Sequence, residues 1–99
     1  MIIAFVHDKD CVDHKWTISR NQLSAGAKQY SAAVTLQQCL DFCVNNVDCV
    51  AVDVNVQREP LTCWPHFNIG NLLDDNVYNQ SGVDQYRLVH RCRRPSPPG

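Results

Sequence analysis

The sequence has no long apolar run and almost no net charge. Nine Lys and Arg residues stand against ten Asp and Glu residues, which gives a net charge of -1 at pH 7. This balance disfavours a globally basic protein that binds nucleic acid. No segment approaches the roughly 20 apolar residues that a membrane span requires. We therefore expect no nucleic acid partner and no membrane insertion by this segment.

Motifs for catalysis are also missing. The sequence contains no Gly-x-Ser-x-Gly, no His-Glu-x-x-His and no glycine loop of the kind that holds phosphate. A cysteine nucleophile needs an unpaired thiol, and an even number of cysteines leaves none. The adjacent acids Asp74 and Asp75 lie in a segment rich in Asn and Asp, where such residues usually form turns. These absences predict a protein that is not an enzyme and has no cofactor.

A metal site is not expected either. Cys39 and Cys43 have a spacing that zinc sites use, but no second pair of this kind follows them. The four histidines are scattered along the chain, at His7, His14, His66 and His90. We therefore interpret the cysteines as disulfide partners.

Six cysteines in 99 residues are the strongest feature that is present. A high, even count in a short chain predicts three disulfides, each worth about 2–4 kcal/mol of stability. Such bonds persist in an oxidising compartment, which predicts a secreted protein or the ectodomain of a membrane protein. The length fits a single domain, and the 44% hydrophobic content is that of a globular protein.

One helix is predicted over residues 36–45. Thr35 precedes an apolar periodic run and Gln38 follows three residues later, which is the capping-box pattern. Asn45 and Asn46 suggest a left-handed stop. The residues that share one helix face are Leu36, Cys39, Leu40 and Cys43.

Several segments have the patterns of antiparallel strands. Residues 50–57 alternate valines with Ala51, Asp53, Asn55 and Gln57, which predicts a half-buried strand. Residues 58–60 form a turn, 61–64 a returning strand, and Pro65 either ends that strand or places it at an edge. Residues 83–91 are again strand-like, and Met1–Val6 is interpreted as a first strand. Residues 24–27 and most of 68–82 are predicted to be loops.

The six cysteines allow 15 pairings. Cys39 and Cys43 lie one helical turn apart with nearly parallel side chains, so they are poor partners for each other. Cys43 and Cys49 flank the connection from helix to strand, which makes them natural partners. Cys39 could then reach Cys63 on the next strand, which would leave Cys11 and Cys92 to join the two ends; the sequence alone does not choose among the pairings.

The residues around these cysteines resemble the PAN/apple family (apple modules and domains like the N-terminal domains of plasminogen and hepatocyte growth factor). In that family a helix carries two cysteines, as at Cys39 and Cys43. The next strand starts Cys-x-Ala and reaches an Asn six residues after the cysteine, as in Cys49–Asn55. Cys63, the outer Cys11 and Cys92, and Tyr86 extend the resemblance to about residues 11–92.

The resemblance implies an α+β fold with a five-stranded antiparallel sheet cradling one helix. It also implies the pairing Cys11–Cys92, Cys39–Cys63 and Cys43–Cys49. The domain would span residues 1–92, with a linker-like tail over 93–99 that is rich in Pro and Arg. The implied function is binding of an extracellular protein or glycan, as one domain of a larger secreted or cell-surface protein, through loops such as 24–33 and 66–82. A single-domain secreted inhibitor or effector is the alternative.

A few residues are candidates for ligand contact or modification. A basic group near the C-terminus suggests a second alternative, a domain that binds sulfated glycosaminoglycan; it consists of Arg87, His90, Arg91, Arg93 and Arg94. A solvated strand face followed by a charged linker explains the same charges. Trp16 is a candidate contact residue, whereas Trp64 beside Cys63 is expected to pack in the core. Asn79 begins an Asn-Gln-Ser glycosylation sequon.

Overall fold

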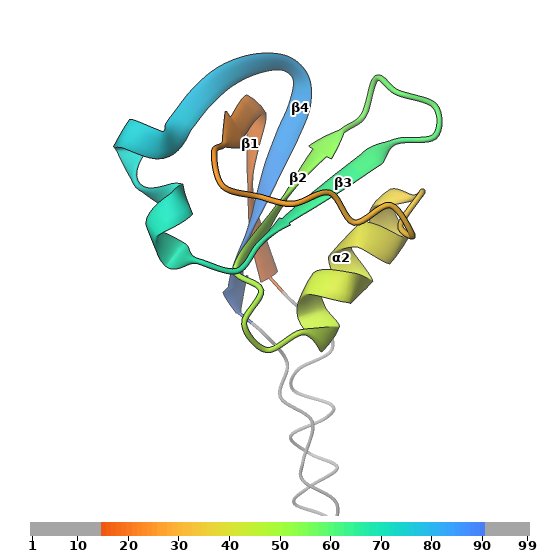
Figure 1. The fold of residues 1–99 in the computed structure, drawn as a ribbon, viewed down its shortest axis with the longest axis horizontal. Coiled ribbons are helices and arrows are strands. Elements are labelled where there is room, and N and C mark those ends of the chain that lie inside the picture. Colours follow the sequence, from red (N-terminus) through yellow and green to blue (C-terminus); the bar gives the residue numbers. More distant parts are fainter. Residues whose placement is uncertain (1–14, 91–99) are drawn as a thin grey trace, which may run out of the picture.

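The computed structural model describes residues 15–90. Within this range four antiparallel strands form one sheet in the order β1-β4-β2-β3, and one α-helix, α2, packs on one of its faces (Figure 1). The elements are β1 (Lys15–Ser24), α2 (Leu36–Asn45), β2 (Ala51–Asn55), β3 (Thr62–His66), two short 3-10 helices η1 (Ile69–Leu72) and η2 (Asp74–Asn76), and β4 (Val77–His90). The α+β class with an antiparallel sheet is confirmed. Residues 15–90 do not contain the expected fifth strand, and Met1–Val6 lies outside the described range.

Helix α2 begins and ends where its sequence predicts. The Thr35 side chain accepts a hydrogen bond from the Gln38 N–H, and the Gln38 side chain accepts one from the Thr35 N–H, which completes the capping box. The left-handed stop was wrong, because Asn46 is extended, with φ at -109°. Its side-chain amide instead donates to the Phe42 carbonyl at 2.6 Å, which satisfies a helix end without a left-handed residue.

Two disulfides fix α2 to the strands. Cys39 is bonded to Cys63 of β3, and Cys43 is bonded to Cys49 just before β2. These are two of the three pairs that the resemblance implies, and the third, Cys11–Cys92, lies outside the described residues. The two helix cysteines project from the same face, so one side of α2 is tied to two places on the sheet.

The apolar core lies between α2 and the sheet. Val52 and Val54 of β2 are fully buried there, with Tyr86 of β4 and the disulfides around them. Full burial of a Val or Leu side chain contributes about 1.5–3 kcal/mol. This layer corresponds to the valine stripe of the sequence.

The prediction that β2 is half-buried was wrong. Ala51 and Asp53, on the face opposite Val52 and Val54, are 0% and 3% exposed. The reason is the position of the strand, since β2 is hydrogen-bonded to β4 on one side and to β3 on the other. A strand in this position has no edge that faces solvent, and its second face is covered by polar side chains from its neighbours.

The β2–β3 hairpin was predicted from its turn. Asn55 pairs with Thr62, and the Glu59–Pro60 peptide bond in the turn is cis. Pro65 lies within β3, whose outer side has no strand partner in the described sheet. This agrees with the alternative that placed Pro65 at an edge, because proline cannot donate to a neighbouring strand.

Strand β1 was not predicted. Trp16 and Ile18 alternate as a strand requires, but the register shifts at Asn21, which lies between Arg20 and Gln22. Asn21 adopts φ of 59°, a left-handed conformation that asparagine tolerates better than most residues, and its side chain accepts a hydrogen bond from the Gly82 N–H. The bulge interrupts the regular alternation of side chains between the two faces of the sheet at Asn21. The next apolar residue, Leu23, therefore does not continue the alternation of Trp16 and Ile18 in the sequence.

Strand β4 begins earlier than predicted. Residues 77–79 pair with Gln22, Leu23 and Ser24 of β1, although 68–82 was expected to be mostly loop. Pairing with β1 offsets the weak strand preference of the Asn and Gly residues in this segment. The chain therefore folds back along β1 as one long curved strand (Figure 1).

Candidate functional site

A buried polar network covers the face of the sheet opposite the disulfides. At its centre is Asp53 of β2, whose Oδ2 accepts a hydrogen bond of 2.7 Å from Nε2 of His66 on β3. His66 is 0% exposed, and its Nδ1 lies 3.1 Å from the side-chain nitrogen of Asn71 in η1. Because the carboxylate can only accept, Nε2 carries the hydrogen and Nδ1 accepts from the Asn71 amide.

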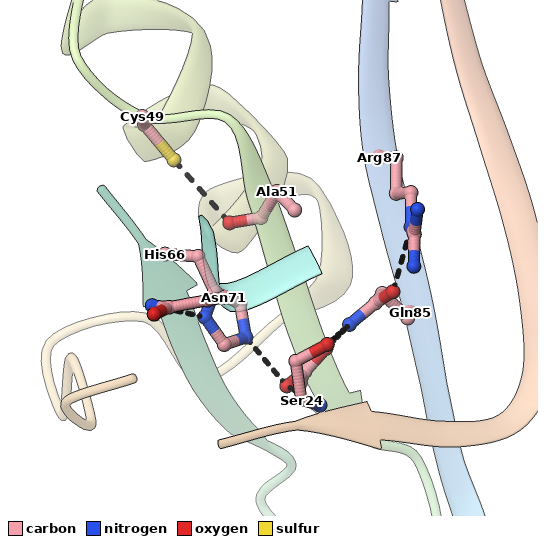
Figure 2. A network of polar contacts seen from close by, with 8 residues as sticks. Ser24, Cys49, Ala51, His66, Asn71, Gln85 and Arg87 are labelled. Atoms are coloured by element: carbon pink, nitrogen blue, oxygen red, sulfur yellow. Dashed lines mark hydrogen bonds and ion pairs between the residues drawn. The ribbon is translucent and has the colours of Figure 1, made fainter. Parts of the chain in front are cut away.

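Strands β1 and β4 complete the network (Figure 2). The Gln85 amide nitrogen donates to Asp53 Oδ1 and to the Ser24 hydroxyl, both at 2.8 Å. The Ser24 backbone N–H donates to Asp53 Oδ2 at 3.0 Å, and the Arg87 Nε donates to the Gln85 carbonyl oxygen at 2.8 Å. Asp53 thus accepts three hydrogen bonds from three other strands. These three hydrogen bonds offset the cost of burying the carboxylate.

The residue types Ser, His and Asp do not form a catalytic triad in this geometry. Within residues 15–90, the Ser24 hydroxyl is hydrogen-bonded to Gln85, while both His66 nitrogens are occupied by Asp53 and Asn71. A general base must be able to take the proton of the nucleophile, and this imidazole has no nitrogen left for it. These hydrogen bonds therefore fix the orientation of the Ser24, His66 and Asp53 side chains.

Gly26 explains how η1 approaches the network. Its φ is +102°, and a Cβ at this position would lie 2.7 Å from the Asn71 side-chain oxygen. Only a residue without a side chain allows Asn71 to lie against this backbone while it reaches His66. The loop after β1 is thereby packed directly on the network.

A cavity of about 360 Å³ opens beside the network. We call it the indole pocket, after Trp64, which is one of its lining residues. Ser24 and Asp53 of the network line it, together with apolar residues of β1, of β4 and of the segment after β1. Its lining residues are Leu23, Ser24, Gly26, Ala27, Asp53, Asn55, Trp64, Gln80 and Val83. The size is within the range of small-molecule sites.

The two tryptophans differ from expectation. Trp64 is 37% exposed and lines the indole pocket, so its prediction as a core residue was wrong. It pairs with Asp53 in the β2–β3 register, which places its side chain on the polar face. Trp16 lies in β1, partly buried against the core, with its ring centroid 6.3 Å from that of Tyr86 in an edge-to-face arrangement. A contact role for Trp16 stays a prediction.

The pocket residues Asp53, Asn55 and Gln80 were not identified from the sequence as site residues. The prediction of a half-buried strand places Asp53 and Asn55 on the face opposite the valines, which would be exposed. One signal was present, since an Asp in the middle of a valine strand disfavours that strand unless its carboxylate has partners. The loops expected to make contact, 24–33 and 66–82, each contribute to the pocket, through Gly26 and Ala27 and through Gln80.

The predicted basic group is only partly within the described range. Arg87 is half-buried and its Nε is bonded to Gln85, whereas His90 is exposed at the end of β4. Arg91, Arg93 and Arg94 lie outside the described residues, as does the tail over 93–99. Asn79 is exposed on β4, so its sequon is accessible in this fold.

Two further properties bear on the site. Within residues 15–90, no group of three His, Cys, Asp or Glu side chains has the arrangement to hold a metal ion. No helix in this part of the chain is long and apolar enough to cross a membrane.

Comparison of the chain with protein-family models, with curated proteins and with solved structures gives no significant match.

Proposed function

We propose that this chain is a non-catalytic binding module of the PAN/apple type, which acts in an oxidising extracellular compartment. The single observation that carries the proposal is a sheet stabilised by disulfides on one face and bearing a pocket with fixed polar groups on the other. Its task would be to present the indole pocket and the loops around it to an extracellular protein or glycan.

The two disulfides support a location outside the cytosol. Both involve cysteines at 0–2% exposure, and none of the four described cysteines is free. Small domains that rely on such bonds are typical of secreted proteins, because cytosolic thiols are kept reduced. The bonds connect α2 to β3 and to the start of β2, so they stabilise the strands that carry Asp53 and Trp64.

Rigidity supports binding. The side chains of Ser24 and Asp53 are held by hydrogen bonds before any ligand arrives. A site that is already ordered loses less conformational entropy when it binds, so its affinity is higher for the same contacts. The absence of a free base beside Ser24 in the described network favours binding over catalysis.

A binding panel tests the proposal. The chain secreted by eukaryotic cells would be measured by surface plasmon resonance against immobilised extracellular matrix proteins and glycans. We expect saturable binding to at least one surface, which disappears after reduction and alkylation. Six free thiols in the secreted protein, or binding to no surface, would contradict the proposal.

A further inference from the structure

We propose that the indole pocket binds an ammonium group carried on a short alkyl chain. The ammonium would lie between the Asp53 carboxylate and the Trp64 ring, and the chain would lie along Leu23 and Val83. This inference rests on the proposed function and assigns a ligand class to that site.

The charge of the pocket is the first argument. Asp53 is the one charged residue among the described residues that line it. Its three hydrogen-bond donors are a backbone N–H, the Gln85 amide and Nε2 of His66. Arg87 donates to the Gln85 oxygen and so reaches the carboxylate only through that amide. The one formal charge among the lining residues is therefore negative, which favours a cation and repels an anion.

Trp64 gives the second argument. Trp64 and Asp53 are direct cross-strand partners, so their Cβ atoms are about 5 Å apart on the same face of the sheet. A cation placed within about 6 Å of an indole ring is attracted by its electron-rich face. One ammonium group can then contact the carboxylate and the ring together. Gln80 also lines the pocket, and its side chain contains an oxygen that can accept a further hydrogen bond.

The walls of the pocket fit an alkyl chain. Leu23, Ala27 and Val83 contribute apolar surface next to the carboxylate. A lysine side chain has four methylene groups, which bury readily against such surface while the charged end keeps its polar partners. A cavity of about 360 Å³ accommodates a chain of this length.

Three probes of equal length separate charge from shape. The oxidised 99-residue chain would be titrated with n-pentylammonium, 1-pentanol and pentanoate at pH 7 while the indole N–H signals of Trp64 and Trp16 are followed by NMR. We expect pentylammonium to shift the Trp64 signal and leave Trp16 unchanged. It should bind at least tenfold more tightly than 1-pentanol, with no binding of pentanoate. Equal binding of the alcohol, binding of pentanoate, or no shift of Trp64 would overturn the inference.

Two variants test the contact between the ammonium group and the Trp64 ring. One replaces Trp64, and the other replaces Trp16 on the opposite face of the sheet. Trp64→Leu should weaken pentylammonium binding about fivefold, the loss expected for one cation–π contact. Trp16→Leu, the matched control, should leave the affinity unchanged because Trp16 packs near Tyr86 on the other face. An unchanged affinity in Trp64→Leu would reject the ring contact.

A third variant keeps the test decisive if Trp64→Leu does not fold. Asn55→Asp retains the side-chain oxygen that accepts from the Gln57 N–H and adds a carboxylate to the pocket. It should tighten pentylammonium binding several-fold and leave 1-pentanol unchanged. A looser ammonium complex in this variant would contradict a cation site.

The source of the ammonium group is a separate comparison. Nα-acetyl-lysine amide, whose side-chain ammonium is unmodified, represents a lysine side chain of a partner protein. Pentylammonium represents a free amine. Tighter binding of the former assigns the pocket to protein recognition, and tighter binding of the latter assigns it to a small amine. Panel binding that persists in Trp64→Leu, with no ammonium binding, would reject this inference and leave the proposed function intact. If the chain binds pentylammonium but binds no surface of the panel, the result would support this inference and contradict the proposed function.

Discussion

Both faces of β2 are largely buried, but by different interactions. On one face Val52 and Val54 pack under α2 among two disulfides. On the other, Asp53 accepts three hydrogen bonds, and His66 and Gln85 are 0% exposed. The first layer depends on apolar contact and covalent bonds, the second on hydrogen bonds that join side chains of all four strands.

The difference determines how each face responds to change. An apolar layer loses stability roughly in proportion to the volume removed, and a neighbour can partly fill the space. A polar layer is destabilised by the loss of a single hydrogen-bonding atom, because a buried donor left without an acceptor costs about 1–3 kcal/mol. The polar face is therefore the more specific of the two, and it is the face that borders the indole pocket.

The largest expected effect is on the disulfide face. Cys39→Ala with Cys63→Ala removes the bond that closes a separation of 24 residues, and should lower the free energy of unfolding by about 3–4 kcal/mol. Urea denaturation followed by circular dichroism measures it. The control is Cys43→Ala with Cys49→Ala, whose separation is 6 and whose loss should be about 1 kcal/mol smaller. The reverse order would show that chain entropy does not control this face.

Asp53→Asn tests the polar face. The amide keeps one oxygen acceptor for three donors and brings an N–H group against them, so we expect a loss of about 3 kcal/mol in unfolding free energy. Asp48→Asn at an exposed position should change stability by no more than about 0.5 kcal/mol. If the two variants were equally stable, the network would not contribute to the fold. Chemical denaturation of both proteins decides this.

Gly26→Ala tests the contact between η1 and the network. The added Cβ meets the Asn71 amide and the backbone has φ of +102°, so we expect a loss of about 1–2 kcal/mol. Amide hydrogen exchange should show faster exchange in residues 66–73 and little change in α2. If η1 exchanged at the same rate in Gly26→Ala as in the native chain, the contact with Gly26 would not hold Asn71 in place.

Arg20→Ala should have the smallest effect. The Arg20 guanidinium is 2.8 Å from Asp84, but its side chain is 69% exposed, and exposed ion pairs contribute about 0–1 kcal/mol. Asp84 also accepts from the Asn21 N–H, so its carboxylate keeps a partner. We expect a thermal midpoint only slightly below that of the native chain. A loss as large as that of Asp53→Asn would place this pair among the main supports of the fold.

Elements set by neighbouring residues were predictable. The capping box of α2 lies within four residues, and the β2–β3 hairpin is connected by a short turn. The alternation in β2 identified the valine face correctly. In each case the decisive contacts are between residues close in sequence, so the pattern itself contains them.

Elements that depend on distant residues were not predictable. The bulge at Asn21 needs Gly82 and Asp84, which lie more than 60 positions away. The network joins Ser24 to Asp53 across 29 positions and to Gln85 across 61. A polar residue on a strand has the same alternation whether it faces water or a hydrogen-bond partner, so the burial of Asp53 could not be inferred from its spacing.

The sequence by itself determined the helix, the valine layer and the presence of disulfides, because local hydrogen bonds and apolar periodicity specify them. The tertiary structure alone decided which face of the sheet carries a pocket, and that Trp64 rather than Trp16 borders it. That decision follows from strand order. With β2 between β4 and β3, the polar side of β2 is enclosed, and its carboxylate must be satisfied by side chains from other strands.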